Sequence, residues 1–201
     1  MRLIIASNNA HKVREIRQIV GKYFTDMSTL RDAGLSIDVV EDGTTFQENA
    51  IKKAEEVLAA ASGFDAALAD DSGLIVDALN GAPGVYSARY AGEGHNDADN
   101  NRKLMEDMKN VPDELRSCRF ASAVALARRG RETLCVIGYA EGRLLHEARG
   151  ENGFGYDPVF QPDGYACSMA ELRPEEKNAI SHRGNALKIL KEELRNYYAD
   201  K

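Results

Sequence analysis

The sequence is poor in the residues that build disulfides and soft metal sites. It has three cysteines (Cys118, Cys135 and Cys167) and four histidines among 201 residues. The cysteines are odd in number and show no C-x-x-C spacing, which favours reduced thiols and a cytoplasmic protein. The histidines are scattered along the chain, and this argues against a zinc site built from clustered ligands.

Long apolar runs and linker-like segments are also absent. No uncharged apolar run approaches the roughly 18 residues that a membrane-spanning helix needs. The opening MRLIIASNN is too short an apolar segment for a signal peptide. We therefore expect no membrane association. No Pro- or Ser-rich linker divides the chain, so the sequence predicts one domain over residues 1–201.

The charge of the chain limits the choice of partner. The net charge is −6, whereas a general nucleic-acid binder is normally basic. We therefore expect no nucleic-acid partner. An anionic small ligand remains compatible with this charge, because a few local lysines can override the average field of the protein.

The periodicity of apolar residues predicts an α/β protein. Helices are expected over 44–62, 97–109 and 185–199, and another follows the strand at 2–6. Further strands are expected in AALAD and LIVDAL, with DDSG as a turn between them. RFASAVALAR and TLCVIGYA predict a hairpin that bends at Gly130. Crossovers together with a hairpin imply a mixed β-sheet flanked by helices.

Hydrogen-bond donors cluster after the first predicted strand. Ser7-Asn8-Asn9-Ala10-His11-Lys12 lies where this strand gives way to a helix. The N-terminus of a helix presents free N–H groups and a positive dipole end, which suit phosphate. The segment is therefore a candidate phosphate site, although a plain helix cap followed by a solvated lysine explains the same pattern. No Walker loop occurs in the chain.

Acidic residues recur near the predicted strand ends. Glu41 and Asp42 precede the helix that contains Lys53, and Asp70-Asp71 follow the apolar run Ala66–Ala69. Mg²⁺ takes oxygen ligands, typically one or two carboxylates together with substrate phosphates. Such an ion would offset the repulsion between the aspartates and leave one carboxylate to take a proton from water. A surface acidic turn is the simpler alternative.

Two later segments combine glycines, aromatic rings and basic side chains. The loop GENGFGY over 150–156 places Phe154 and Tyr156 beside glycines, where a ring can stack on a base. Residues 176–184 gather lysine, serine, histidine and arginine, which suit carbonyls and phosphates. The simpler alternatives are a turn with core aromatics and a helix cap with a solvated arginine.

Five motifs taken together resemble the inosine triphosphate pyrophosphatases, which act on non-canonical purine nucleoside triphosphates. The motifs, which cover nearly the whole chain, are ASNNAHK, EDGTTFQENAIKKA, ADDSGLIVDALNGAPGVYSARYAG, GFGYDPVF and EEKNAISHRGNAL. The resemblance implies Mg²⁺-dependent hydrolysis of ITP, dITP and XTP to the monophosphate and pyrophosphate, which cleanses the nucleotide pool. It also implies an elongated mixed α/β fold with two lobes and an active-site cleft between them, usually in a homodimer.

The resemblance also implies roles for individual residues. Asp71 would be the catalytic proton acceptor, and Glu41, Asp70 and Asp71 would hold the metal. The implied substrate-binding residues are Ser7, Asn8, Asn9, Ala10, His11, Lys12, Lys53, Ser72, Phe154, Gly155, Tyr156, Asp157, Lys177, His182 and Arg183. Lys12 and Lys53 would contact phosphates, and Phe154 would stack on the purine. The basic residues at 177, 182 and 183 would favour a 6-keto group over a 6-amino group.

Three other functions fit parts of the sequence. A related pyrophosphatase for pyrimidine or modified nucleotides would share the phosphate motifs. A nucleotide sensor without turnover would share the lysines, but it would gain nothing from Glu41 and Asp71 without a metal. A structural protein with an acidic surface would leave Lys12, Lys53 and Lys177 in their motifs unexplained.

Overall fold

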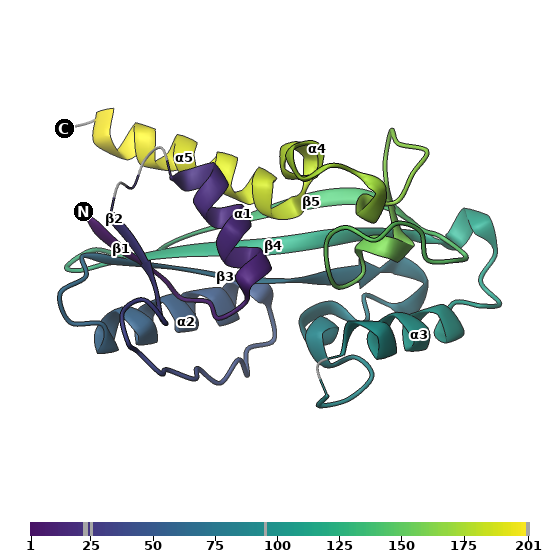
Figure 1. Ribbon diagram of the computed structural model, residues 1–201, viewed down its shortest axis with the longest axis horizontal. Coiled ribbons are helices and arrows are strands. Elements are labelled where there is room, and N and C mark those ends of the chain that lie inside the picture. Colours follow the sequence, from purple (N-terminus) through teal and green to yellow (C-terminus); the bar gives the residue numbers. More distant parts are fainter. Residues whose placement is uncertain (22–23, 25, 95, 200–201) are drawn as a thin grey trace. The chain divides into compact units, whose positions relative to one another are not determined.

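The described part of the computed structural model is a mixed sheet with helices. It comprises residues 1–21, 24, 26–94 and 96–199. The strands are β1 (Arg2–Ile5), β2 (Asp26–Thr29), β3 (Ala66–Val76), β4 (Ser117–Arg128), β5 (Leu134–Leu144) and β6 (Phe160–Pro162). The helices are α1 (Ala10–Val20), α2 (Phe46–Ala60), α3 (Asp97–Asp107), α4 (Pro174–Ile180) and α5 (His182–Ala199) (Figure 1). In these residues no helix combines the length and apolarity that crossing a membrane requires.

Parallel and antiparallel pairs both occur in the sheet, whose strand order is β2-β1-β3-β4-β5-β6. Strand β1 pairs in parallel with β2 and with β3, so Leu3 lies opposite Met27 on one side and Ala66 on the other. Strands β5 and β6 are antiparallel. Neighbours β4 and β5 are joined by residues 129–133, a connection too short for the crossover that parallel strands need. The predicted mixed α/β fold is therefore confirmed.

The chain divides into two compact units, each assembled from separate stretches of sequence. The first unit comprises Met1–Asp71, Ser122–Gly138 and Arg183–Lys201, and the second comprises Ser72–Ala121 and Tyr139–His182. In the first unit, apolar residues of α1 and α5 share one core cluster with residues of β1, β3 and β4. These two helices therefore cover the same face of the sheet, and α2 lies on the other side (Figure 1).

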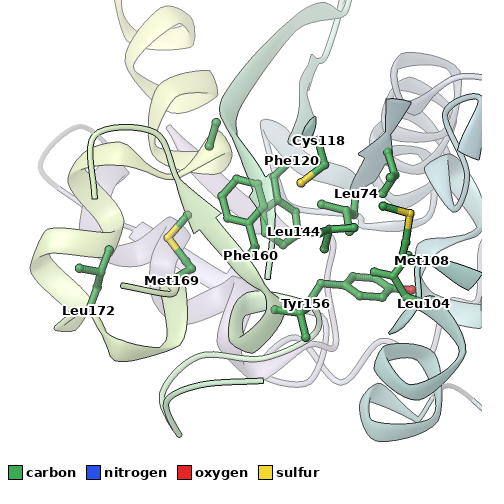
Figure 2. Packing of buried hydrophobic residues seen from close by; sticks show 13 residues of the cluster. Leu74, Leu104, Met108, Cys118, Phe120, Leu144, Tyr156, Phe160, Met169 and Leu172 are labelled. Carbon is green, nitrogen blue, oxygen red and sulfur yellow. The ribbon is translucent and has the colours of Figure 1, made fainter. Parts of the chain in front are cut away.

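The second unit has its own aromatic core. The rings of Phe120 and Phe160 lie 4.7 Å apart between centroids. Tyr156 belongs to the same buried cluster as Leu104 of α3 and Met108, the residue that follows α3, and Figure 2 shows its ring beside these side chains. The loop that contains Tyr156 and the helix α3 are therefore packed into one core.

The expected turn at DDSG is wrong, because β3 continues through it from Ala66 to Val76. Successive side chains of a strand point to opposite faces. Asp70 and Asp71 therefore point away from each other, although both are buried. Each carboxylate has a hydrogen-bonding partner on its own face of the sheet, so both can be buried in a continuous strand.

The predicted helices are confirmed with small differences at their ends. The helix expected over 44–62 is α2, whose N-terminus carries a capping box formed by Thr45 and Glu48. The helix expected over 97–109 ends at Asp107. The last helix begins at His182, three residues before the expected start at 185. Strands β2 and β6 were not predicted, since four and three residues carry too little periodicity.

Candidate active site

The segment after β1 caps helix α1. The Oδ1 atom of Asn9 accepts hydrogen bonds from the backbone N–H groups of His11 at 2.9 Å and Lys12 at 3.2 Å. The N–H group of Asn9 itself donates to the Oγ atom of Ser7 at 3.2 Å. Ser7 is buried, whereas residues 8–10 are exposed. The helix cap of the simpler alternative is therefore present, but Lys12 is not a solvated lysine, because only 16% of its side chain is exposed.

Lys12 leads from this turn into a buried ionic network in the first unit. Its Nζ atom lies 3.3 Å from Asp70 Oδ2. The Nε atom of Arg183 donates to the same oxygen at 3.0 Å, and its Nη1 atom donates to Glu15. The network joins Glu15 of α1, Asp70 of β3 and Arg183 of α5, and only 1% of the Arg183 side chain is exposed. Three elements of the unit are thus tied together by buried charges.

The network fixes the ionisation of Asp70. Burial alone would raise the pKa of this carboxyl, but the charges of Lys12 and Arg183 outweigh burial and hold the pKa well below its ordinary value of 3.8. Asp70 therefore stays ionised at any pH at which the protein works. A carboxylate of this kind is a poor proton acceptor, since it binds a proton too weakly.

Asp71 has the opposite character. Burial is the main cause that raises its pKa to about 6, and the nearby charges of Glu41 and Asp70 add to the effect. Asn49 opposes them by donating a hydrogen bond from Nδ2 to Asp71 Oδ2 at 2.9 Å. A base with a pKa of about 6 is mostly ionised at neutral pH and still binds a proton usefully. Asp71 is therefore the candidate base of the pair.

Asn49 also organises the acidic turn before α2. Its Oδ1 atom accepts a hydrogen bond from the backbone N–H of Gly43 at 2.7 Å, while its Nδ2 atom holds Asp71. A Cβ atom at Gly43 would lie only 2.6 Å from that Oδ1 atom, so this close approach requires glycine. The 41–43 turn is thus connected to β3 through one buried amide side chain.

Lys53 and Glu41 form an ion pair beside these groups. Burial acts to lower the pKa of Lys53, but the Glu41 carboxylate outweighs burial, so the pKa is raised and the lysine stays charged. Asp70 and Asp71 also act on the Lys53 charge. The predicted phosphate and metal residues of the first unit therefore form one electrostatic network.

The carboxylates of this network do not form a ready-made metal cage. No group of three or more His, Cys, Asp or Glu side chains is arranged to hold a metal ion anywhere in the described ranges. The donor set nevertheless fits a hard cation that takes most of its ligands from elsewhere, because all of its donors are carboxylate oxygens. In addition, the buried Oδ1 atom of Asp70 accepts no hydrogen bond from the residues that the structure describes.

The second unit contains a separate group of predicted site residues. The Oδ2 atom of Asp157 accepts hydrogen bonds from the backbone N–H of Phe154 at 2.9 Å and from Lys177 Nζ at 2.7 Å. The Lys177 ammonium also lies 4.8 Å from the centroid of the Phe154 ring. The hydroxyl of Tyr156 donates to the backbone oxygen of Ser87 at 2.8 Å. The 154–157 loop is therefore ordered by contacts of its own side chains.

Two more predicted residues of this unit lie at its sequence boundaries. The imidazole of His182 is buried and stacks on Phe120, with ring centroids 4.7 Å apart and an interplanar angle of 15°. Ser72 is half-buried on β3, directly after Asp71. His182 is thus part of the aromatic core as well as of the SHRG motif.

Sequence analysis missed two residues of the candidate site, Glu15 of the ionic network and Asn49. Glu15 lies three positions after Lys12 on α1, a spacing that places both on one helix face. This spacing was the available signal, but a glutamate at such a position usually faces solvent. Asn49 lies inside the FQENA segment, where nothing in the sequence links it to Asp71, 22 positions away.

The fold and this charged site together define an α/β protein with a centre rich in lysine and carboxylate side chains. The chain belongs to the Ham1 family, whose model matches residues 3–193. The resemblance found in the sequence motifs is thereby confirmed.

Individual relatives cover nearly the full length of the chain. A dITP/XTP pyrophosphatase of Clostridium perfringens is 48% identical over 96% of this chain and 97% of its own length. The solved structure of the Staphylococcus aureus Ham1 protein is 38% identical, with a TM-score of 0.87 over 98% of this chain and 100% of that one. A Ham1 protein structure from Coxiella burnetii is 40% identical, with a TM-score of 0.86 over 98% and 99% of the two chains.

Proposed function

We propose that this protein hydrolyses ITP, dITP and XTP to the nucleoside monophosphate and pyrophosphate in a Mg²⁺-dependent reaction, and so removes deaminated purines from the nucleotide pool. The observation that carries the proposal is Asp71, a buried carboxylate with a pKa of about 6 in a network with Lys12 and Lys53. The relatives named dITP/XTP pyrophosphatase, 44–48% identical to this chain, support the choice of substrates.

The proposed chemical step is attack of water on the α-phosphorus. Asp71 accepts a proton from the water as its oxygen forms a bond to the α-phosphorus. The bond from this phosphorus to the oxygen that bridges to the β-phosphorus breaks, and the electron pair leaves with pyrophosphate. Lys12 and Lys53 balance the charge of the departing group. Asp70 keeps Lys12 in place through its ion pair.

The charge of the network supports a divalent cation as cofactor. With Asp71 ionised, the network has one more anionic than cationic side chain. The cationic side chains are those of Lys12, Lys53 and Arg183, and the anionic ones are those of Glu15, Glu41, Asp70 and Asp71. A triphosphate therefore needs further positive charge to bind here. Glu41 and Asp71 are the proposed Mg²⁺ ligands, and Mg²⁺ would neutralise phosphate charge and polarise the phosphoryl oxygens. Asp70, the third ligand expected from the sequence, is left out, because its carboxylate lies on the other face of β3 and pairs with Lys12 and Arg183.

We assign base recognition to residues of the second unit. Phe154 offers a ring for stacking, and Lys177 and His182 carry donors that favour a 6-keto purine over adenine. Arg183 is left out of this set, because its guanidinium is buried against Glu15 and Asp70.

We further propose that the protein is cytoplasmic and forms a homodimer. The three cysteines, which form no disulfide, are in keeping with the cytoplasm. Light scattering coupled to size exclusion tests the dimer.

The proposal is tested by measuring pyrophosphate release from ITP, XTP, dITP, ATP, GTP and dTTP, each with Mg²⁺ and with chelator. We expect strong metal-dependent turnover of the first three and little turnover of ATP or GTP. A preference for dTTP or another standard nucleotide would overturn the base assignment and leave the phosphate assignment standing. Binding of ITP without turnover of any nucleotide would identify a sensor instead.

Replacing Asn49 with alanine is expected to move the acidic limb of the pH profile of kcat/KM to higher pH. The substitution removes a hydrogen bond to the ionised form of Asp71, so the pKa of this carboxyl rises above about 6. The loss of one such bond corresponds to a move of about one pH unit. Gln47→Ala, on the same helix, serves as the control and should leave the limb in place. An unchanged limb in Asn49→Ala would contradict the assignment of that limb to Asp71.

A further inference from the structure

The backbone of Gly155 is held at both ends by side chains of α3, a helix outside all the sequence motifs. The N–H group of Gly155 donates to Asp97 Oδ2 at 2.7 Å. Its carbonyl oxygen accepts a hydrogen bond from Asn101 Nδ2 at 2.8 Å. Asp97 and Asn101 are four positions apart and therefore lie on one face of the helix. Two adjacent side chains of α3 thus clamp a single residue of the loop.

The clamp acts at a residue whose backbone is in the left-handed region. Gly155 has a φ of +61°, in the left-handed region that favours glycine. A Cβ atom at this position would meet nothing within 4 Å, so the glycine is required for its conformation and not for space. Because a glycine is free to adopt many conformations, external hydrogen bonds are needed to select this one.

On either side of Gly155 lie the two aromatic residues of the loop. Phe154 is tied to Asp157 and Lys177, and Tyr156 is tied to Ser87 and to the core shared with α3 (Figure 2). Rotation of the Gly155 peptide would turn the direction in which the Phe154 ring leaves the backbone. The hydrogen bonds from α3 therefore bear directly on the orientation of this ring.

Helix α3 is itself well anchored, as a clamp requires. Asn100 accepts a hydrogen bond from the N–H of Ala91 at 2.7 Å and donates to the backbone oxygen of Ala88 at 3.1 Å. The hydroxyl of Tyr90 donates to Asp107 at 2.6 Å near the other end of the helix. Asn96 caps the start of the helix, directly before Asp97. The first turn of α3 is thus a fixed platform.

We infer that Asp97 and Asn101 are positioning residues that set the Phe154 ring for stacking on the purine base of the substrate. This inference rests on the proposed function, and it assigns to α3 a part in base recognition. Neither residue touches the reacting phosphate in this account. Their loss should therefore weaken binding of the base and leave the chemical step and the phosphate contacts intact.

The test compares Asp97→Ala, Asp97→Asn, Asn101→Ala and Asp99→Ala in hydrolysis of XTP. Asp99 is the matched control, because it is another acid of the first turn of α3 but pairs with Arg102. We expect Asp97→Ala and Asn101→Ala to raise KM about tenfold with kcat within about twofold, the effect of one lost hydrogen bond on binding. Asp97→Asn keeps an acceptor oxygen and should restore most of the loss.

Inhibition by inorganic tripolyphosphate, which has no base, separates positioning from general damage. Its inhibition constant should stay unchanged in every variant. An unchanged KM in Asp97→Ala and Asn101→Ala, with the wild type active, would overturn the inference alone. So would equal weakening of XTP and tripolyphosphate, or a rise in Asp99→Ala as large as in Asp97→Ala. A wild type without turnover of any nucleoside triphosphate would overturn the proposed function, and the inference with it.

Discussion

Asp71→Asn is expected to lower kcat for XTP by about 10²–10⁴-fold, the usual contribution of a positioned general base. The asparagine side chain has nearly the shape of aspartate but accepts no proton at working pH. It still offers an oxygen to the Nδ2 donor of Asn49, so the hydrogen bond at 2.9 Å has a counterpart in the variant. The loss of turnover should therefore occur in a folded protein.

The same substitution is expected to stabilise the protein at pH 8. The folded protein raises the pKa of Asp71 from 3.8 to about 6, so it binds the proton more tightly than the unfolded chain does. Stability is consequently lost as the pH rises from about 4 to about 6, by at most about 3 kcal/mol. The asparagine variant does not lose stability in this pH range. The difference in free energy of unfolding between the variant and the wild type should be large at pH 8 and vanish below pH 4.

Urea denaturation at pH 4 and pH 8, together with steady-state kinetics, measures both effects. Asp42→Asn is the matched control, because Asp42 is an exposed carboxylate of the same region that pairs with Lys52. This control should keep the activity and stability of the wild type. Near-normal turnover in Asp71→Asn would remove Asp71 as the base. A variant that is less stable than the wild type at pH 8 would contradict the raised pKa.

Arg183→Met is expected to lower the free energy of unfolding by about 3–5 kcal/mol, the cost of removing one partner from a buried ion pair. The substitution leaves the Glu15 carboxylate without its guanidinium and leaves Asp70 with Lys12 as its charged partner. Methionine fills much of the volume, so the cost is electrostatic and not that of a cavity.

The measurement is again urea denaturation, with Arg102→Met as the control. Arg102 also pairs with a carboxylate, that of Asp99, but 76% of its side chain is exposed. Exposed pairs of this kind contribute at most about 1 kcal/mol. A loss in Arg183→Met no larger than that of the control would contradict the buried network. It would return Arg183 to the set of residues that contact the base.

Strand β3 shows which parts of the fold could be predicted from the sequence alone. The apolar run at 66–69 and the adjacent aspartates were recognisable, but the aspartates were interpreted as a turn. A strand passes through them because their partners lie far away in sequence: Arg183 is 113 positions from Asp70. Local patterns cannot contain such a partner, and polar residues in a strand then look like a break.

The candidate site shows the same division between local and distant information. The helix cap at Asn9 involves residues two or three positions apart, and it was among the interpretations drawn from the sequence. The contact of Asp97 with Gly155 spans 58 positions, and Asp97 belongs to no motif. The motifs contain Lys12, Asp70 and Arg183 of the ionic network but not Glu15, and the ionisation of the two aspartates depends on burial, which only the fold reveals.

The repulsion between the neighbouring aspartates is resolved within the protein. Alternation along β3 separates the two carboxylates, and Arg183 with Lys12 neutralises Asp70. Asp71 accepts a hydrogen bond from Asn49, and burial raises the pKa of its carboxyl. The pair thus yields one permanent anion and one base, which is the division of roles that water-activated hydrolysis needs.

The most direct test of the central claim is hydrolysis of XTP in water enriched in oxygen-18, followed by phosphorus NMR of the products. Attack on the α-phosphorus, as proposed, gives equal amounts of the monophosphate and pyrophosphate, with the heavy oxygen in the monophosphate alone. Label in pyrophosphate would place the attack at the β-phosphorus. Release of labelled orthophosphate and the nucleoside diphosphate would place it at the γ-phosphorus. Either of these two results would contradict the proposed function.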